Sequence, residues 1–373
     1  MSIPLLSARA LERALAVRDL TDPAQGPHAL QLLLRDVVEA LRTRWRADLH
    51  LHRAGPVVSV ADNYDALGYP PDGAARDARY TRYVSPAQVL RTQTSALVPP
   101  LLRGLAAESG DDVLLVCPGL VYRRDCIDRL HTGTPHQVDL WRVTRGALGG
   151  AALDEMAALV LEAALPGRAW RSTPARHPYT VEGLQLDARD GDGWTEVGEC
   201  GLAHPELLGR CGLSGRSGLA MGLGLDRLLM LRKGLPDIRL LRSEEPRGQA
   251  QLLDLSAWRP VSRQPKVVRD LSLAVDGAED VSAEALGDRV REALGARAEW
   301  VEAVEVLSRV PGAAVPPVAA ERLGLEAGQD NVLVRVVLRA VDRALTSEEA
   351  NGLRDEVYAA LHRGTRWTWA GRR

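Results

Sequence analysis

A glycine-punctuated segment that runs straight into a leucine-rich stretch constrains this chain more than any other feature. It reads SGLAMGLGLDRLLMLRKGLPDIRLL, residues 217–241. Glycines such as Gly222 and Gly224 inside a strand mark a place where a ligand or another backbone approaches closely. Arg227 follows among mostly apolar residues, and a buried arginine there needs an anionic partner, either an internal carboxylate or a bound anion. The segment predicts a flat binding surface on a strand, followed by a helix that stops at GLPD.

A second polar segment lies between two β-rich runs, VYRRDCIDRLHTGTPHQVDLW, residues 121–141. Because strand side chains alternate between faces, Gln137 and Asp139 share one face of the second run. With Arg123 and His131 on the preceding segment, this pattern suits a phosphate held by guanidinium and a small molecule held by amide and carboxylate. An ordinary surface hairpin with charge pairs is the alternative interpretation.

Composition narrows the class of protein. The 373 residues and 46% hydrophobic content allow two compact domains, and the net charge of −2 gives no general attraction to nucleic acid or membrane. Four cysteines without a Cys-x-x-Cys pair do not suggest a disulfide framework, and no apolar run is long enough for a membrane span. These features favour a cytoplasmic protein. The chain also contains no phenylalanine.

Hydrophobic spacing predicts helices over residues 28–48 and 152–165 and a hairpin over residues 183–204 with its turn at DGDG. After about residue 255 the order of expected elements is β-α-β-β-α-β, the ferredoxin-like pattern. Thr346 and Glu349 form an expected capping box for its second helix, and TRWTWAG, residues 365–371, is its expected last strand.

The two polar segments together resemble motifs 2 and 3 of class II aminoacyl-tRNA synthetases, and more closely those of the phenylalanyl-tRNA synthetase family. VYRRDCIDRLHTGTPHQVDL follows that family's pattern V-[FY]-R-R-D-x-x-D-x-x-H-x-x-x-F-H-Q-[ILV]-E. Further similar stretches are NYDAL, VLRTQTSA, WTEVGECGLAHPELL and RPVSRQPKVVRDLSL. The resemblance covers roughly residues 28–373. It implies an α+β fold, with an antiparallel class II sheet flanked by helices and then the ferredoxin-like domain.

The resemblance also implies a division of the chain and a reaction. Residues 1–27 would be an N-terminal extension, 28–254 the catalytic domain and 255–373 an anticodon-binding domain. ATP would lie bent on the sheet, and an amino-acid carboxylate would attack its α-phosphorus, with Mg²⁺ and arginines stabilising charge. A tRNA would then accept the acyl group. Both parts in one chain, as in the family's organellar form, imply a monomer.

Roles implied by the resemblance fall on individual residues. Arg123 would hold the α-phosphate, Arg227 the γ-phosphate, and His131 the distal phosphates. Positions implied for adenine are Asp125, Pro135, Gly222 and Gly224. Positions implied for the amino acid are Gln93, Ser95, Gln137, Asp139, His177, Tyr179 and Ala220. Glu196 and Glu199 are candidate Mg²⁺ ligands, with a solvated hairpin charge as an equal alternative for Glu199.

Several departures from the family pattern each remove a phenylalanine. The family's F-P-F-T is HPYT here, so that His177 and Tyr179 replace the two residues that line the ring pocket. Pro135 stands where a phenylalanine stacks on adenine, and Gln93 replaces a family histidine. Either a phenylalanine-activating enzyme avoids its own substrate, or the pocket is remodelled for another amino acid. Unpaired polar groups against an apolar ring would cost about 1–3 kcal/mol each, which favours remodelling.

The tail HRGTRWTWAGRR combines arginines and tryptophans in a pattern suited to tRNA contact, and its candidates are Arg363, Arg366, Trp367, Trp369 and Arg372. An edge strand with both tryptophans facing the core is the favoured alternative. Two other functions stay open. One is a paralogue that adenylates a different amino acid for a non-tRNA acceptor. The other is a non-catalytic RNA-binding homologue.

Overall fold

The computed structural model describes residues 3–78, 80–107, 110–124, 126–260, 265–340 and 343–367. It divides into two compact units. The first comprises Met1–Arg123, Thr134–Pro236 and Gln249–Arg259, and the second comprises Arg124–Gly133, Asp237–Gly248 and Pro260–Arg373. The short loop Arg124–Gly133 therefore makes its contacts within the second unit, although the strands on either side of it belong to the first.

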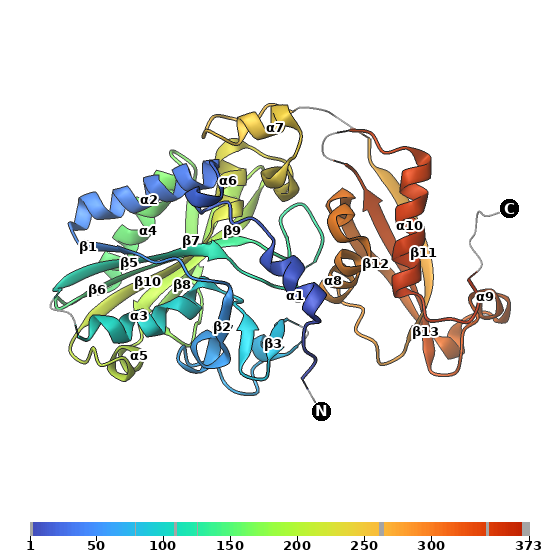
Figure 1. Cartoon of the computed structure of the whole chain (residues 1–373), viewed down its shortest axis with the longest axis horizontal. Coiled ribbons are helices and arrows are strands. Elements are labelled where there is room, and N and C mark those ends of the chain that lie inside the picture. Colours follow the sequence, from blue (N-terminus) through green and yellow to red (C-terminus); the bar gives the residue numbers. More distant parts are fainter. Residues whose placement is uncertain are drawn as a thin grey trace. The chain divides into compact units, whose positions relative to one another are not determined.

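The first unit is built on a seven-stranded sheet in the order β1-β5-β6-β10-β9-β8-β7, seen in Figure 1. Only the β1–β5 pair is parallel. The strands are β1 Asp48–Leu51, β5 Asp112–Leu120, β6 His136–Thr144, β7 Trp170–Pro174, β8 Thr180–Asp190, β9 Gly193–Ala203 and β10 Ser217–Gly224. The predicted hairpin is confirmed as β8 and β9, which turn at Gly191, where φ is +56°. The mainly antiparallel sheet, flanked by helices, agrees with the expected α+β class.

Helices cover both faces of this sheet. Three of them, α2 Ala29–Trp45, α4 Gly150–Ala164 and α6 Leu225–Lys233, pack together on one face (Figure 1). α3 Val98–Leu105 and α5 Pro205–Arg210 pack on the other through an apolar cluster. α6 follows the glycine-rich β10 directly and ends at Gly234, which adopts the left-handed conformation that glycine favours.

Shorter elements complete the first unit. A second, three-stranded sheet has the order β2-β4-β3, with β2 Val57–Ser59, β3 Tyr83–Ser85 and β4 Gln88–Leu90. The sequence predicted neither β3 nor β4 as a strand. The short helix η4 Thr94–Leu97 leads into α3, and α1 Ala8–Leu15 lies near the N-terminus. α7 Pro246–Gln251 is divided between the units, since Pro246–Gly248 belong to the second and the rest of the helix to the first.

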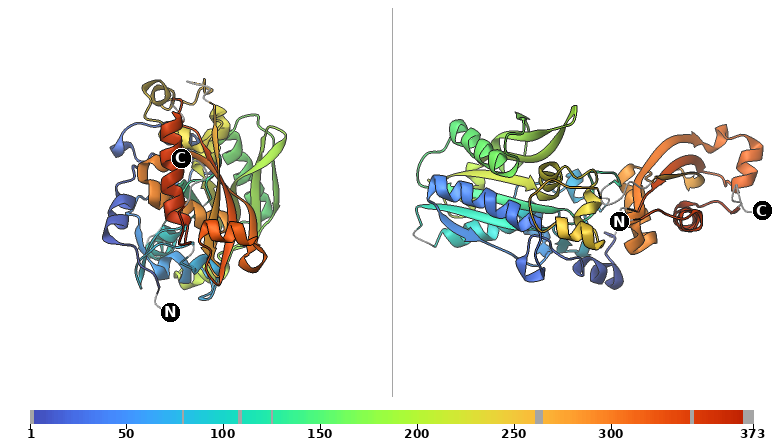
Figure 2. Two further views of the ribbon diagram at one scale, coloured as in Figure 1. Left: turned by 90° about the vertical axis from the view of Figure 1, so that its right-hand side faces the viewer. Right: turned by 90° about the horizontal axis from the view of Figure 1, so that it is seen from above.

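The second unit has a sheet in the order β11-β13-β12, with β11 Val267–Asp276, β12 Val301–Pro311 and β13 Gln329–Leu338. α8 Ala283–Leu294 and α10 Ser347–Leu361 cover one face of it (Figure 2). The predicted capping box is present at the start of α10. α9 Pro317–Leu323, between β12 and β13, was not predicted.

The expected last strand is not found in the part of it that the structure describes. Residues 365–367 are not in a strand, and residues 368–371 lie outside the described residues. In the observed order the outer edge of β11 carries no further strand among the described residues, and this is the edge that the ferredoxin-like pattern pairs with its last strand.

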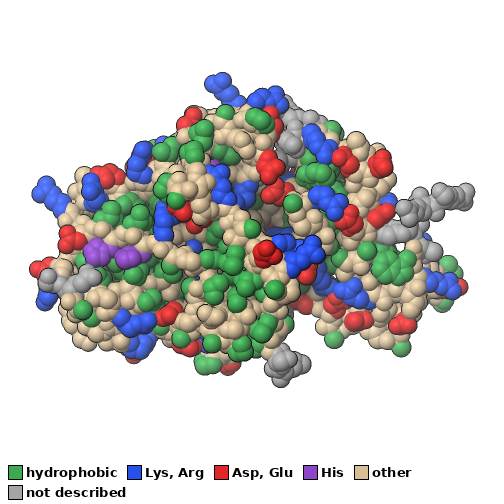
Figure 3. Space-filling view, viewed as in Figure 1, with side chains coloured by type: hydrophobic (Ala, Val, Ile, Leu, Met, Phe, Trp, Pro, Cys, Tyr) green, Lys and Arg blue, Asp and Glu red, His purple; other side chains and the backbone are tan. Residues whose placement is uncertain are grey.

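Among the described residues, no helix is both long and apolar enough to cross a membrane. The four cysteines are all free thiols, and only Cys126 is more than slightly exposed. On the face drawn in Figure 3, basic and acidic side chains are interspersed, as the near-zero net charge suggests.

Candidate active site

A row of residues across three strands of the large sheet forms the centre of the candidate site. Asp139 of β6 lies directly opposite Gly222 of β10, and Gly222 lies directly opposite Glu199 of β9. Residues that are opposite each other in a ladder project to the same face. Two carboxylates therefore flank a glycine on one surface.

The glycines at the end of β10 leave open space above the sheet. A Cβ added at Gly222 would meet nothing closer than Oδ2 of Asp139, at 4.0 Å, and one at Gly224 would meet the Val197 carbonyl at 3.8 Å. Gly198 differs, because a Cβ there would lie 2.5 Å from the Gly222 carbonyl oxygen. Close strand packing therefore requires Gly198, whereas Gly222 and Gly224 keep a flat surface clear, as the sequence predicted.

Arginines and glutamates gather beside this surface. Arg227, in the first turn of α6, donates from Nη1 to the Glu196 carbonyl at 3.2 Å. Desolvation raises the pKa of Glu196, Glu199 adds to this, and Arg227 and Arg123 oppose it. These four charged groups are thus close enough to interact. Guanidinium groups bind phosphate oxygens, and carboxylates are the side chains that Mg²⁺ prefers.

The carboxylates fit a magnesium site in their chemistry. Oε2 of Glu199 lies 2.6 Å from Nε2 of His177. Each carboxylate has two oxygens and several lone pairs, so that this contact leaves acceptor capacity on Glu199. Mg²⁺ commonly uses one or two carboxylates together with substrate phosphates.

Asp139 is almost completely enclosed. It is 2% exposed, and its carboxylate accepts from Thr94 Oγ1 at 2.8 Å, Ser95 Oγ at 3.0 Å and Trp141 Nε1 at 3.0 Å. Burial raises the pKa of Asp139, and these three hydrogen bonds offset part of the increase. These donors occupy three of the roughly four lone-pair sites of the carboxylate, so that little acceptor capacity is left for an incoming ammonium group.

This burial predicts a pH effect on stability. Because the folded pKa of Asp139 is above its ordinary value of 3.8, the folded state holds the proton more tightly, and stability falls as pH rises from about 4 through the raised pKa. We expect Asp139→Asn to remove the contribution of this carboxyl group to the dependence of stability on pH. Urea midpoints of both proteins between pH 4 and pH 8 measure it, and identical slopes would show that Asp139 does not titrate in this way.

Aromatic rings occupy the region implied for the substrate side chain. Tyr179 is 9% exposed and stacks on the fully buried Trp141, with ring centroids 6.0 Å apart. Tyr69 and His177 lie 6.4 Å and 5.9 Å from the Tyr179 ring. Ala220 lies directly opposite Trp141 in the ladder and is also buried. Tyr179 and Trp141 thus fill space that a ligand ring would need.

Trp141 was not singled out from the sequence, although its position gave a signal. It stands two residues after Asp139 on the same strand, and alternate residues share a face. Its indole N–H also holds the Asp139 carboxylate, so that one residue connects the two parts of the pocket.

Gln93 holds the segment around η4 against the NYDAL segment. Its Nε2 donates to the Asn63 carbonyl at 3.1 Å, and its Oε1 accepts from the Tyr69 hydroxyl at 3.1 Å. The Asn63 side chain is buried and donates to Thr92 Oγ1 at 2.9 Å. Arg123 donates to the Thr92 carbonyl at 2.9 Å, which fixes this arginine near the same segment. Asn63 was quoted from the sequence but not recognised as a positioning residue.

A second positioning group was missed entirely. His136 is fully buried, its Nδ1 lies 2.9 Å from Oδ1 of Asp226, and its Nε2 accepts from the Leu20 amide at 3.0 Å. Since Nε2 is an acceptor, the proton is on Nδ1 and is donated to the carboxylate. The pair ties the start of β6 to the start of α6, beside Gln137 and Arg227.

The loop Arg124–Gly133, which contains His131, belongs to the second unit. Asp125 lies outside the described residues. His131 Nδ1 contacts both carboxylate oxygens of Asp128, at 2.8 Å and 2.7 Å. Burial acts to raise the pKa of Asp128, but hydrogen bonds from His131 and the Leu130 amide outweigh it and hold the pKa well below the ordinary value. Pro135 belongs to the first unit, where its carbonyl accepts from the Val121 amide at 2.9 Å.

The tail candidates lie in the second unit. Arg363 pairs with Glu279 at 3.5 Å, and Arg366 pairs with Glu321 at 3.0 Å. Trp367 is 48% exposed and meets the ring of the buried Tyr358 edge-on at 5.9 Å, so that only part of its ring packs against the core. Trp369 and Arg372 lie outside the described residues.

Comparison with known proteins finds similarity to tRNA synthetases. Residues 24–252 match the family described as "tRNA synthetases class II core domain (F)". The phenylalanine–tRNA ligase alpha subunit of Mycolicibacterium gilvum is 36% identical over 196 residues, which are 50% of this chain and 55% of that protein. The chloroplastic/mitochondrial phenylalanine–tRNA ligase of Arabidopsis thaliana is 30% identical over 326 residues, 82% of this chain and 70% of that protein.

A third relative is the mitochondrial phenylalanine–tRNA ligase of Dictyostelium discoideum, which is 26% identical over 353 residues, 79% of this chain and 73% of that protein. This chain therefore spans just over half of the Mycolicibacterium gilvum subunit and about seven tenths of each organellar enzyme.

Proposed function

Because this chain belongs to the phenylalanyl-tRNA synthetase family of class II tRNA synthetases, we propose that it activates an amino acid with ATP and transfers it to a tRNA. The observation that carries the proposal is the open surface at Gly222 and Gly224, which lies beside two arginines and two glutamates. That surface suits a flat base, and the charged groups suit a polyphosphate with its metal ion.

In the proposed reaction the protein positions its substrates and stabilises charge. Arg123 holds the α-phosphate as the amino-acid carboxylate attacks it, and Arg227 holds the γ-phosphate as pyrophosphate leaves. Glu196 and Glu199 would hold Mg²⁺, which supplies charge neutralisation on the phosphate oxygens. No protein nucleophile is required, so the rate depends on orientation and electrostatics. His131 is proposed for the distal phosphates and Asp125 and Pro135 for adenine, by family resemblance alone.

For the amino acid we propose phenylalanine or a related aromatic. Gln137 and the Gln93–Ser95 segment would orient its polar end, and Tyr69, His177 and Tyr179 would border its ring, above Ala220. In this proposal the Tyr179 ring moves aside when the substrate enters. We further propose that the chain acts in the cytoplasm as a monomer, and that Arg363, Arg366 and Trp367, together with Trp369 and Arg372, contact tRNA.

A second candidate function has its own support. If Tyr179 and Trp141 remain in place, the pocket accepts a smaller or more polar side chain than phenylalanine. The chain would then adenylate another amino acid, and its acceptor need not be a tRNA.

Amino-acid-dependent exchange of labelled pyrophosphate into ATP tests the proposal and separates the two candidates. We expect exchange that depends on phenylalanine, tyrosine or another aromatic amino acid, measured with all twenty amino acids and Mg²⁺. Exchange that depends only on a non-aromatic amino acid would support the second candidate. An absence of exchange with every amino acid, with and without tRNA, would contradict both and favour a non-catalytic RNA-binding role.

A further inference from the structure

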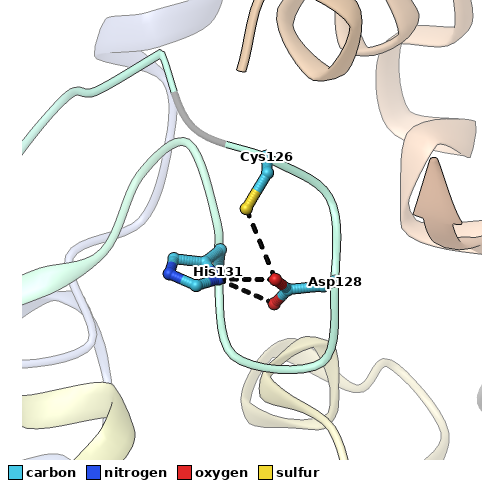
Figure 4. A group of neighbouring side chains, drawn as sticks. All are labelled: Cys126, Asp128 and His131. Carbon is cyan, nitrogen blue, oxygen red and sulfur yellow. Dashed lines mark hydrogen bonds and ion pairs between the residues drawn. The ribbon is translucent and has the colours of Figure 1, made fainter. Parts of the chain in front are cut away.

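Three potential metal ligands of different chemistry meet on the loop of the second unit. Sγ of Cys126, a carboxylate oxygen of Asp128 and a ring nitrogen of His131 all lie within 4.8 Å of one another. In Figure 4 Sγ of Cys126 and Nδ1 of His131 both face the carboxylate of Asp128. Each is partly exposed, so a small ion has access to them.

We propose that Cys126, Asp128 and His131 form a binding site for a zinc-class divalent cation. A thiolate, an imidazole and a carboxylate are the three ligand types that Zn²⁺ uses, and the thiolate makes Mg²⁺ or Ca²⁺ a poor alternative. Three protein ligands leave a fourth tetrahedral position for water or another ligand. Such a site suits reversible binding better than a permanent structural role.

The distances are close to those that a tetrahedral ion requires. Zn–O and Zn–N distances of about 2.0–2.2 Å and a Zn–S distance of about 2.3 Å place an oxygen and a sulfur about 3.6 Å apart and an oxygen and a nitrogen about 3.4 Å apart. The observed separations are 3.4 Å from Cys126 Sγ to Asp128 Oδ2 and 2.7 Å from His131 Nδ1 to the same atom. The Cys–Asp pair is already at the required spacing, and the His–Asp pair must open by roughly 0.7 Å.

The loop backbone is anchored where the ligands project. Arg291 donates to the Cys126 carbonyl at 2.7 Å, and the Val304 amide donates to the Ile127 carbonyl at 3.2 Å. The Ile127 side chain is buried in the core of the second unit with residues of α8 and β12. The site is therefore partly formed before an ion arrives, which reduces the entropy lost on binding.

Binding has a consequence that rests on the proposed function. An ion at Nδ1 of His131 would fix its imidazole in the loop and withdraw it from the role proposed for it at the ATP phosphates. Zinc would then lower the rate of ATP-pyrophosphate exchange. Cys126 occupies a position that the family pattern leaves unspecified, so that its replacement should leave metal-free exchange unchanged.

Cobalt titration of the untagged, metal-stripped, full-length protein tests the site directly. We expect one equivalent of Co²⁺ to produce the near-ultraviolet charge-transfer band of a cobalt thiolate, and Zn²⁺ to displace it. Cys126→Ser should abolish the band and weaken zinc binding by at least about 10-fold. The control Cys211→Ala removes a different free thiol and should keep the band. No band in the wild type, or an equal band in Cys126→Ser, would overturn the proposal.

Zinc inhibition of exchange forms a separate arm. We expect zinc to inhibit exchange by the wild type. Inhibition of Cys126→Ser should require a zinc concentration at least about 10-fold higher. Zinc binding at Cys126 with no change in exchange would overturn the link to ATP. If the wild type shows no exchange at all, the proposed function fails, while the cobalt titration still decides whether the metal site exists.

Discussion

Arg227→Ala is expected to lower kcat/KM for ATP-pyrophosphate exchange by about 10²- to 10³-fold, the effect of removing one preorganised charge-stabilising group. In free-energy terms this is a loss of about 2.7–4 kcal/mol of transition-state stabilisation. Arg227 lies beside Glu196 at the start of α6, where its guanidinium can meet a phosphate that extends past the glycines of β10. Initial rates at varied ATP concentration, with the activating amino acid in excess, measure the effect.

The matched control is Arg145→Ala, which removes an exposed guanidinium of the same unit that pairs with the exposed Asp111. We expect its exchange rate to stay within about 2-fold of the wild type, since surface pairs contribute little. An Arg227→Ala protein that exchanges as fast as Arg145→Ala would remove Arg227 from the catalytic proposal.

Asp226→Ala is expected to destabilise the first unit by about 2–5 kcal/mol. The Asp226 carboxylate accepts from both the amide and the Nδ1–H of the fully buried His136, and its removal leaves two buried donors unsatisfied. Each such donor costs about 1–3 kcal/mol. Urea denaturation followed by tryptophan fluorescence measures the loss of unfolding free energy. If the two units unfold separately, the transition of the first unit is the one to compare.

Asp226→Asn provides the comparison, because it keeps one acceptor oxygen at nearly the same place. We expect it to lose less than half of what Asp226→Ala loses. If Asp226→Ala unfolds within about 0.5 kcal/mol of the wild type, as surface substitutions usually do, the His136–Asp226 pair does not hold β6 and α6 together.

Features that depend on local spacing could be predicted from the sequence. The alternation of residues 183–204 and the DGDG turn predicted β8 and β9, and the Thr346–Glu349 spacing predicted the capping box of α10. The glycines of β10 predicted an open surface, because the absence of their side chains leaves space above the sheet. Each of these signals lies within one short, continuous stretch of the chain.

Features that depend on distant partners could not be predicted in this way. Thr94 and Ser95 are 45 and 44 residues from Asp139, and only the fold brings their hydroxyls to its carboxylate. The His136–Asp226 pair joins residues 90 positions apart. The β2-β4-β3 sheet was missed because its strands have three residues each, too few for alternation to stand out.

The candidate site combines both kinds of information. The sequence stretches that resemble the family contain Glu196, Glu199 and Arg227. The structure brings these residues close to Arg123. Tyr179 stacks on Trp141, which shares a strand face with Asp139, but only the fold brings these two rings together. For that reason the sequence leaves open which amino acid enters the pocket.

Formation of aminoacyl-tRNA tests the central claim most directly. Purified protein is incubated with ATP, Mg²⁺, total tRNA and each labelled amino acid that supports exchange, and acid-precipitable, alkali-labile label on the tRNA is counted. The account predicts a charged tRNA whose formation requires ATP and falls by at least about 10²-fold in Arg227→Ala. Adenylate that forms at full rate without any label reaching tRNA would contradict tRNA as the acceptor and point to a different one.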